Sequence, residues 1–235
     1  MKLSVIIPTF NEGKTIEKII KNVLLQKDVY EVVVINDGSI DHTEDILKTI
    51  TKKFVKDKNL TVVSHEKNRG KGAAIRTGIE NVAGDTIIIQ DADLEYDPKE
   101  YRILLNKFTG KNVVYGSRIL GNNKHAYKRT YLGNITLTWI NNLLYENNLT
   151  DIYTCYKIIP TKIAKKLNLH SNGFEIEAEI TAKLQNIGIK IIEVPITFNP
   201  RHYEEGKKIK AIDALKGICT LLFYKLLSSK KLRTS

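Results

Sequence analysis

The chain has 235 residues, of which 42% are hydrophobic and 27% charged, and its formal net charge is +11. This size suits one α/β domain of ordinary globular composition, and the positive charge favours partners that carry phosphate. Two cysteines are too few for a disulfide framework and indicate a cytoplasmic location. The sequence contains no apolar run of about 20 residues, so we expect no membrane-spanning helix.

Short apolar runs alternate with helical patterns in the first half of the chain. The β-branched runs predict strands that are covered on both faces, over residues 3–7, 32–35, 60–63, 86–89 and 113–115. Apolar residues at helical spacing predict helices between these strands, over residues 16–24, about 41–54 and 73–82. This alternation predicts an α/β fold with a parallel, doubly wound sheet.

The second half of the chain is less regular. Its patterns predict helices at about 133–146 and 175–186, a strand at 191–198, a charged polar loop at 199–208 and an apolar helix at 211–227.

Each of the five predicted strands is followed by turn-forming or ionisable residues. The segments concerned are Pro8–Glu12, Asn36–Ser39, Asn68–Gly72, Gln90–Asp93 and Gly116–Arg118. In parallel α/β sheets, ligands bind beyond the carboxyl ends of the strands. Five such segments at one sheet edge predict a polar cleft of nucleotide size.

Asp91 and Asp93 stand two residues apart directly after a buried strand. In an extended segment their side chains would share a face, and the two carboxylates would repel each other unless a cation lay between them. Ligands that are all oxygens suit Mg²⁺ or Mn²⁺, and Glu95 could add a third oxygen. The alternative is that the two carboxylates only cap the following turn.

These segments resemble family 2 glycosyltransferases of the GT-A fold, in which a mostly parallel sheet carries helices on both faces. The resemblance is strongest to polyprenyl-phosphate sugar synthases of the dolichyl-phosphate mannosyltransferase type. It extends over about residues 3–208 and rests on segments in the family's order: Val5–Glu12, Asn36–Asp41, Asn68–Ala74, Asp91–Glu95, Gly116–Arg118 and Glu193–Ile196.

The resemblance implies a nucleotide-sugar site and a metal site. The first would comprise Pro8, Thr9, Phe10, Glu12, Asp37, Lys71, Asp91, Ala92, Asp93 and Arg118. Asp37 would accept a hydrogen bond from the base, which could be uracil or guanine. A Mn²⁺ or Mg²⁺ ion would be held by Asp91, Asp93 and Glu95. Glu95 stands where the mannosyltransferase-type enzymes commonly have Gln, so the resemblance leaves the identity of the transferred sugar open.

The later segments would form the acceptor side. Asp151–Lys157 stands where related enzymes have an Asp followed by a Thr-Ser-Gly-Phe-type turn, with Cys155–Tyr156 in place of Ser-Gly. The resemblance makes Glu179, and then Glu177, the catalytic carboxylates beside Asp93 and Arg118. The candidate cations for an acceptor phosphate are Lys128, Arg129, Arg201, Lys207 and Lys208, of which the last three lie in a loop that resembles a mobile loop of the family.

The implied reaction is a direct, inverting transfer of a hexose from GDP-mannose or a UDP-sugar. A polyprenyl phosphate acceptor arrives largely deprotonated, because its second pKa is about 6, and it needs no strong base. A sugar hydroxyl of a glycan or glycolipid would need a carboxylate base, so both acceptors remain open. Three other functions are disfavoured: a sugar-1-phosphate nucleotidyltransferase, a catalytically inactive scaffold and a nucleic-acid-binding protein.

The expected organisation is a catalytic domain followed by a C-terminal helix. Residues 1–208 would be catalytic, with a nucleotide-sugar half at 1–120 and an acceptor half at 121–208, and residues 209–235 would form an amphipathic helix and a basic tail. This helix, together with Tyr131–Tyr145, predicts peripheral contact with the cytoplasmic face of an anionic membrane. Alternatively, both helices pack on the core, form a homodimer contact or bind a membrane-anchor partner.

Overall fold

The computed structural model describes residues 1–54, 59–121, 123, 128–200 and 211–231. A seven-stranded sheet of order β3-β2-β1-β4-β6-β5-β7 forms its centre. The strands are β1 (Leu3–Thr9), β2 (Val29–Asn36), β3 (Asn59–Ser64), β4 (Thr86–Ile89), β5 (Val113–Ser117), β6 (Lys157–Pro160) and β7 (Ile191–Pro195). Among these strands, β6 runs antiparallel to β4 and β5, and the other pairs are parallel. The expected mostly parallel sheet is confirmed.

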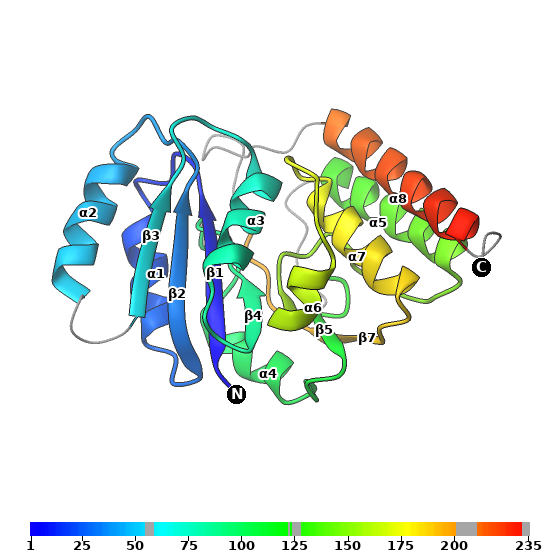
Figure 1. Cartoon of the computed structure of the whole chain (residues 1–235), viewed down its shortest axis with the longest axis horizontal. Coiled ribbons are helices and arrows are strands. Elements are labelled where there is room, and N and C mark those ends of the chain that lie inside the picture. Colours follow the sequence, from blue (N-terminus) through cyan, green and yellow to red (C-terminus); the bar gives the residue numbers. More distant parts are fainter. Residues whose placement is uncertain (55–58, 122, 124–127, 201–210, 232–235) are drawn as a thin grey trace.

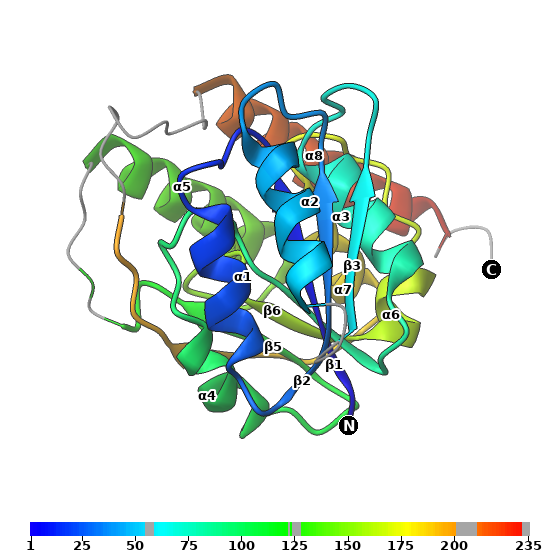
Figure 2. The ribbon, with the colours of Figure 1, turned by 90° about the vertical axis from the view of Figure 1, so that its left-hand side faces the viewer.

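Helices cover both faces of the sheet, as expected. They are α1 (Ile16–Leu24), α2 (Thr43–Phe54), α3 (Lys71–Asn81), α4 (Tyr101–Leu105), α5 (Lys128–Tyr145), α6 (Thr161–Lys166), α7 (Ile176–Asn186) and α8 (Ala211–Lys231), with a short 3₁₀ helix η1 (Pro98–Glu100) before α4. In Figure 1, α1 and α2 lie on one side of the strands and α3 lies on the other. In Figure 2, α1 and α2 lie in front of the strands.

The predicted strands are all present, but their ends differ. β1 continues through Pro8 to Thr9, because both residues pair in register with the end of β2. The last predicted strand ends at Pro195 rather than at residue 198. β6 was not among the predicted strands, because its four residues are too few to show a period. The helix expected from Asp41 begins at Thr43, and the Asp41 carboxylate accepts hydrogen bonds from the Thr43 and Gly13 amides.

The core lies between the sheet and its helices. Every residue of β4 is buried, as are Val5, Ile6 and Ile7 of β1, and each of the aliphatic side chains among them contributes about 1.5–3 kcal/mol when it leaves water. The small residues of α3 bring that helix close to β1, because a Cβ at Gly78 would lie 2.3 Å from Ile6 Cγ2. This packing gives the loops beyond the strands a rigid base.

A second layer of helices lies at the other end of the molecule, where α5, α7 and α8 run side by side (Figure 1). Leu221 and Tyr224 of α8 are buried against Ile152 and against Ala178 of α7. The Tyr145 hydroxyl of α5 also donates to the Leu221 carbonyl at 3.0 Å. One side of α8 therefore packs on the domain. No helix in the described ranges has both the length and the apolar character that are needed to cross a bilayer.

Candidate active site

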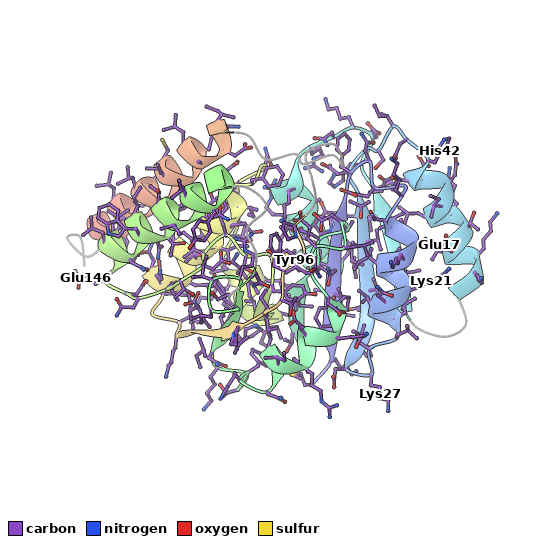
Figure 3. The ribbon with its side chains drawn as sticks, turned by 180° about the vertical axis from the view of Figure 1, so that it is seen from behind. Glu17, Lys21, Lys27, His42, Tyr96 and Glu146 are labelled. Atoms are coloured by element: carbon purple, nitrogen blue, oxygen red, sulfur yellow. The ribbon has the colours of Figure 1, made fainter. Side chains whose placement is uncertain are left out.

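The carboxyl ends of the strands open into a cleft of about 470 Å³. The cleft brings together most of the residues expected to bind the donor and the metal: Pro8, Thr9, Phe10, Glu12, Asp37, Lys71, Asp91, Ala92, Asp93, Glu95, Arg118 and Glu177. Its lining also includes residues that had no individual role in the sequence analysis: Asn68, Gly70, Ala74, Tyr96, Tyr153 and Phe174. In Figure 3, Tyr96 lies near the middle of the molecule, between the sheet and the α5–α8 layer.

The structure does not describe the side chains expected to bind an acceptor phosphate. Arg201, Lys207 and Lys208 are outside the described residues, and the side chains of Lys128 and Arg129 in α5 are not described. Their expected contact with an acceptor phosphate stays a prediction.

The segment after β4 is a turn rather than an extended strand. Asp93 Oδ1 accepts a hydrogen bond from the Glu95 amide at 3.1 Å, and Leu94 has a φ of 65°. Residues other than glycine rarely adopt this left-handed backbone conformation, and those that do cluster in the turns of functional sites. The expectation that Asp91 and Asp93 share a face of extended chain is therefore wrong, although both line the cleft.

Gln90 anchors this turn to the core. Its side-chain amide donates to the Asp91 carbonyl at 3.0 Å, and its Oε1 accepts from the Tyr101 and Tyr156 hydroxyls, each at 2.7 Å. All three side chains are buried. Tyr156, which was expected in an acceptor wall, instead packs in the core and supports the end of β4.

A row of alternating charges crosses one wall of the cleft. Lys71 Nζ lies 2.8 Å from Asp91 Oδ1 and 3.3 Å from Glu177 Oε1. The other Glu177 oxygen contacts Lys157 Nζ, which also donates to the Thr154 carbonyl. Lys157 is fully buried and Glu177 is 2% exposed. Two ammonium groups and two carboxylates thus balance each other, with Lys157 and Glu177 buried and Lys71 and Asp91 partly exposed to the cleft.

Burial and charge set the protonation of this row. Burial disfavours the charged form of Lys71, but the Asp91 and Glu177 carboxylates outweigh this effect and raise its pKa. Burial likewise opposes an ionised Asp91, yet Lys71 and the Cys155 thiol lower the pKa of that carboxyl. For Lys157, burial prevails over the pull of Glu177 and lowers the pKa. Lys71 therefore keeps a positive charge within the cleft.

Arg118 is held in place by a second buried ion pair. Its Nε and Nη2 atoms donate to the two Asp151 oxygens at 2.7 and 2.8 Å, and its amide donates to the same carboxylate. Glu193 in turn accepts hydrogen bonds from the Thr150 and Asp151 amides. Two-point contact between guanidinium and carboxylate fixes orientation as well as charge. Arg118 thereby lines the cleft with its guanidinium in a fixed orientation.

Glu179, the favoured catalytic carboxylate of the sequence analysis, does not line the cleft. It accepts hydrogen bonds from the His170 and Ser171 amides and from the Tyr224 hydroxyl, and it pairs with Lys183 at 2.6 Å. Burial would raise the pKa of this carboxyl, but the hydrogen bonds from Lys183 and Ser171 lower it to about 2. Of the two candidates, the structure brings Glu177 into the cleft and leaves Glu179 to hold a loop.

The loop that Glu179 holds supports the glycine-rich start of α3. The Asn172 carbonyl accepts hydrogen bonds from the Gly72 and Ala73 amides. A Cβ at Gly72 would lie 2.4 Å from the Ser171 carbonyl oxygen, so this contact requires a glycine. Arg76 of α3 also donates to the His170 and Ser171 carbonyls. The amides that open α3 are thereby used within the protein.

Within the described residues, no three His, Cys, Asp or Glu side chains form a preformed metal cluster. Asp91, Asp93 and Glu95 nevertheless line one cleft. A cation there would need further oxygen ligands from a bound substrate or from water.

Lys157 and Asp151 carry the buried ion pairs of this site, yet the sequence analysis gave neither a role of its own. One signal was present for Lys157, because a lysine beside Ile158 and Ile159 at the start of an apolar run is a candidate for a buried charge. Its partner could not be identified, since Glu177 lies on a helix far along the chain.

Comparisons with known proteins agree with this architecture. The family model described as "Glycosyl transferase family 2" matches residues 4–167. An uncharacterized protein of Methanocaldococcus jannaschii, MJ1222, is 30% identical over 96% of this chain and 93% of its own length. A dolichyl-phosphate beta-glucosyltransferase of Trichomonas vaginalis is 28% identical over 94% and 72%, respectively. A dolichol-phosphate mannosyltransferase of Pyrococcus furiosus is also 28% identical, and the chain spans 59% of its length.

Among solved structures, the chain resembles glucosyl-3-phosphoglycerate synthase from Mycobacterium tuberculosis, in a complex with Mn²⁺, uridine diphosphate and glucosyl-3-phosphoglycerate. The TM-score is 0.70 at 18% identity, and the match covers 95% of this chain and 79% of the other. At this identity the likeness shows a shared fold.

Proposed function

Because the chain belongs to glycosyl transferase family 2 and is thus a glycosyltransferase, we propose that it transfers a hexose from a nucleoside-diphosphate sugar to a polyprenyl phosphate. The acceptor phosphate oxygen would attack the anomeric carbon as the bond from that carbon to the diphosphate breaks, with inversion. Two relatives whose names specify dolichyl or dolichol phosphate support this acceptor class.

The observation that carries the choice of acceptor is the position of Glu177 between two lysines. Both of its oxygens lie beside lysine ammonium groups, so Glu177 would have to give up a contact with Lys71 or Lys157 to reach an acceptor hydroxyl. A sugar hydroxyl needs a base, whereas a phosphate monoester is largely deprotonated near neutral pH. An acceptor that arrives as an anion therefore suits this cleft better than a hydroxyl.

The carboxylates after β4 fit a divalent cation that is held jointly with the donor. Asp91, Asp93 and Glu95 supply oxygen ligands only, the type that Mg²⁺ and Mn²⁺ prefer, and Mg²⁺ usually binds one or two carboxylates together with substrate phosphates and water. A preformed cluster is not needed for such a site. When bound, the cation would neutralise charge that develops on the leaving diphosphate.

The cationic side chains of the cleft would assist the same step. Lys71 keeps its positive charge next to Asp91, and Arg118 keeps a fixed orientation through Asp151. Preorganised charges of this kind stabilise a transition state without moving during the reaction. Lys71 would offset the diphosphate charge, and Arg118 would position phosphate or sugar oxygens.

A comparison of two lipids tests the acceptor. With Mn²⁺ and a panel of nucleotide sugars, the enzyme is expected to glycosylate a polyprenyl phosphate, while a polyprenol of the same chain length reacts only at background. The two lipids differ only in the phosphate, so lipid affinity is matched. Transfer to a glycolipid hydroxyl, with none to the polyprenyl phosphate, would show that the acceptor is wrong while the glycosyltransferase activity stands.

An exposed apolar surface on α5 and α8 supports a place at the membrane. Besides the side that packs on the domain, α8 exposes Ile212, Leu215, Leu222, Phe223, Leu226 and Leu227, and α5 exposes Leu132, Ile135, Trp139 and Leu143. Both helices lie at the same end of the molecule (Figure 1). Exposed apolar surface with a nearby lysine, here Lys216, is typical of interfacial helices. We place this end on the cytoplasmic face of an anionic membrane.

Two exposed residues test this membrane surface. Trp139 and Leu226 are 63% and 65% exposed, so the pair of substitutions Trp139→Ser and Leu226→Ser should leave the core intact. We expect affinity for phosphatidylglycerol-containing vesicles to fall about tenfold or more in co-sedimentation. Leu25→Ser, at a residue 76% exposed next to α1, is the matched control. Unchanged vesicle binding, with a loss of dimer in gel filtration, would assign the surface to a second copy instead.

A further inference from the structure

Asp37 lies in the cleft with most of its hydrogen-bonding capacity already used. His65 Nδ1 lies 2.6 Å from Asp37 Oδ1, and the Arg69 amide donates to the same oxygen at 2.9 Å. The Gly70 amide donates to Oδ2 at 2.8 Å. The Asp37 side chain is 3% exposed and that of His65 is 6% exposed. Three donors of the protein thus converge on a carboxylate that lines the cleft.

The direction of the His65 contact follows from chemistry. A carboxylate accepts hydrogen bonds but cannot donate them, so His65 must carry its proton on Nδ1. Its Nε2 lies 3.0 Å from the Thr77 hydroxyl, which can serve as the partner of the second ring nitrogen. His65 is therefore held between Asp37 and α3 as a fixed donor to Oδ1.

The backbone donors are fixed as well. Gly70 has a φ of 96°, and a Cβ there would lie 2.3 Å from the Asn172 carbonyl oxygen. The same carbonyl accepts the Gly72 amide at 2.7 Å. The segment that presents the Arg69 and Gly70 amides is therefore wedged between Asp37 and the loop around Asn172, and it cannot turn those amides away without losing these contacts.

A carboxylate offers about four acceptor sites, two on each oxygen. Oδ1 of Asp37 has two protein donors, and Oδ2 has one. One site thus remains, on Oδ2. Uracil presents a single N–H, at N3, between two carbonyl groups. Guanine presents two adjacent donors, at N1 and the 2-amino group, and pairing both with a carboxylate requires a free site on each oxygen.

Resting on the proposed function, we infer that Asp37 accepts one N–H from the nucleobase and that the donor is a uridine diphosphate sugar rather than a guanosine diphosphate sugar. His65 is then a specificity-determining residue, because it occupies the site on Oδ1 that guanine would need. Bound guanine would leave one polar donor without a partner in a cleft wall, and such unpaired groups are the usual basis of strong discrimination.

Nucleotide analogues test this inference on the unmodified protein. In calorimetric titrations with Mn²⁺, we expect uridine diphosphate to bind at least about tenfold more tightly than guanosine diphosphate. Methylation at N3 of uracil removes the single donor and should weaken binding about 10- to 100-fold. Methylation at C5 leaves that donor in place and should change affinity less than about threefold. Equal or tighter binding of guanosine diphosphate, or no effect of the N3 methyl group, would overturn the inference.

Variants at His65 test the count of acceptor sites. The double substitution His65→Phe with Thr77→Val frees one site on Asp37 Oδ1 and leaves no orphaned hydroxyl, so the preference for uridine over guanosine diphosphate should narrow about fivefold or more. Thr77→Val alone keeps the His65 contact with Asp37 and should keep the preference. An unchanged preference in a folded double variant would refute the role of His65.

Failure of this inference can be told apart from failure of the proposed function. Tight binding of guanosine diphosphate, with transfer from its sugar, would overturn the base assignment alone. If neither nucleotide bound in the presence of Mn²⁺, both the base assignment and the proposed function would be contradicted.

Discussion

Replacing Asp91 by asparagine is expected to lower kcat/KM for sugar transfer about 1,000-fold, the largest loss of activity that we expect from one substitution. Asparagine has nearly the same shape but no charge. It would therefore be a poor ligand for a divalent cation, and it would remove the carboxylate 2.8 Å from Lys71. The measurement is initial-rate kinetics with Mn²⁺, a nucleotide sugar and a polyprenyl phosphate.

A second aspartate in the same segment provides the control. Asp97 accepts a hydrogen bond from the Lys99 amide at the start of η1 and does not line the cleft. Asp97→Asn makes the same chemical change outside the cleft and should keep kcat/KM within about threefold, since surface changes of this kind are usually small. Near-normal turnover of a folded Asp91→Asn variant would contradict the metal and diphosphate site.

The largest effect on stability is expected from Lys157→Met. This substitution removes the partner of the buried Glu177 and leaves only Lys71 to balance Glu177 and Asp91, and breaking a buried ion pair costs about 3–5 kcal/mol in the free energy of unfolding. Methionine fills similar volume, so the loss of charge is the main change. Urea denaturation, followed by fluorescence of the single tryptophan, measures it.

Charge balance predicts a partial recovery in the double variant. Glu177→Gln alone leaves two ammonium groups with one carboxylate, whereas Lys157→Met together with Glu177→Gln leaves the balanced pair of Lys71 and Asp91. The double variant should therefore be at least about 2 kcal/mol more stable than the sum of the single effects predicts. If the effects of the two single substitutions on the free energy of unfolding simply added up in the double variant, the charges of this row would not be coupled.

The exposed pair of Glu17 and Lys21 is the control for these measurements. Both residues lie on the outer side of α1 (Figure 3), their charged atoms are 2.5 Å apart, and their side chains are 52% and 43% exposed. Lys21→Met should leave the free energy of unfolding almost unchanged, because water and salt screen such pairs. A similar cost at Lys157 and Lys21 would mean that burial does not decide the strength of these pairs.

Local sequence patterns were sufficient to predict most of the sheet and the donor side of the cleft. A β-branched run such as Thr86–Ile89 indicates a buried strand from its own composition, and parallel strands bring their carboxyl ends to one edge. Asp37, Asp91 and Arg118 could therefore be assigned to one cleft from their positions after strands. This inference needed only neighbouring residues and one general rule of topology.

Contacts between segments that are distant in the chain could not be predicted from those local patterns. Residues 177 and 179 differ by about 200° around a helix, so helical geometry separates their faces, but it does not say which face meets the cleft. The packing of α7 against α8 decided this, because it turns Glu179 toward Tyr224 and Glu177 toward Lys71 and Lys157. The placement of Tyr156 in the core likewise depends on Gln90, 66 residues away.

The sequence by itself determined the alternating α/β architecture, the edge at which the ligand cleft opens and the carboxylates that enter it after β2 and β4. These features follow from periodicity and from residue chemistry over a few positions. Only the tertiary structure decided that Glu177 faces the cleft, that Lys157 balances the Glu177 charge and that His65 donates a hydrogen bond to Asp37 Oδ1. The reason is physical: a buried charge or acceptor is defined by all the groups packed around it, and those groups come from segments that the chain folds together.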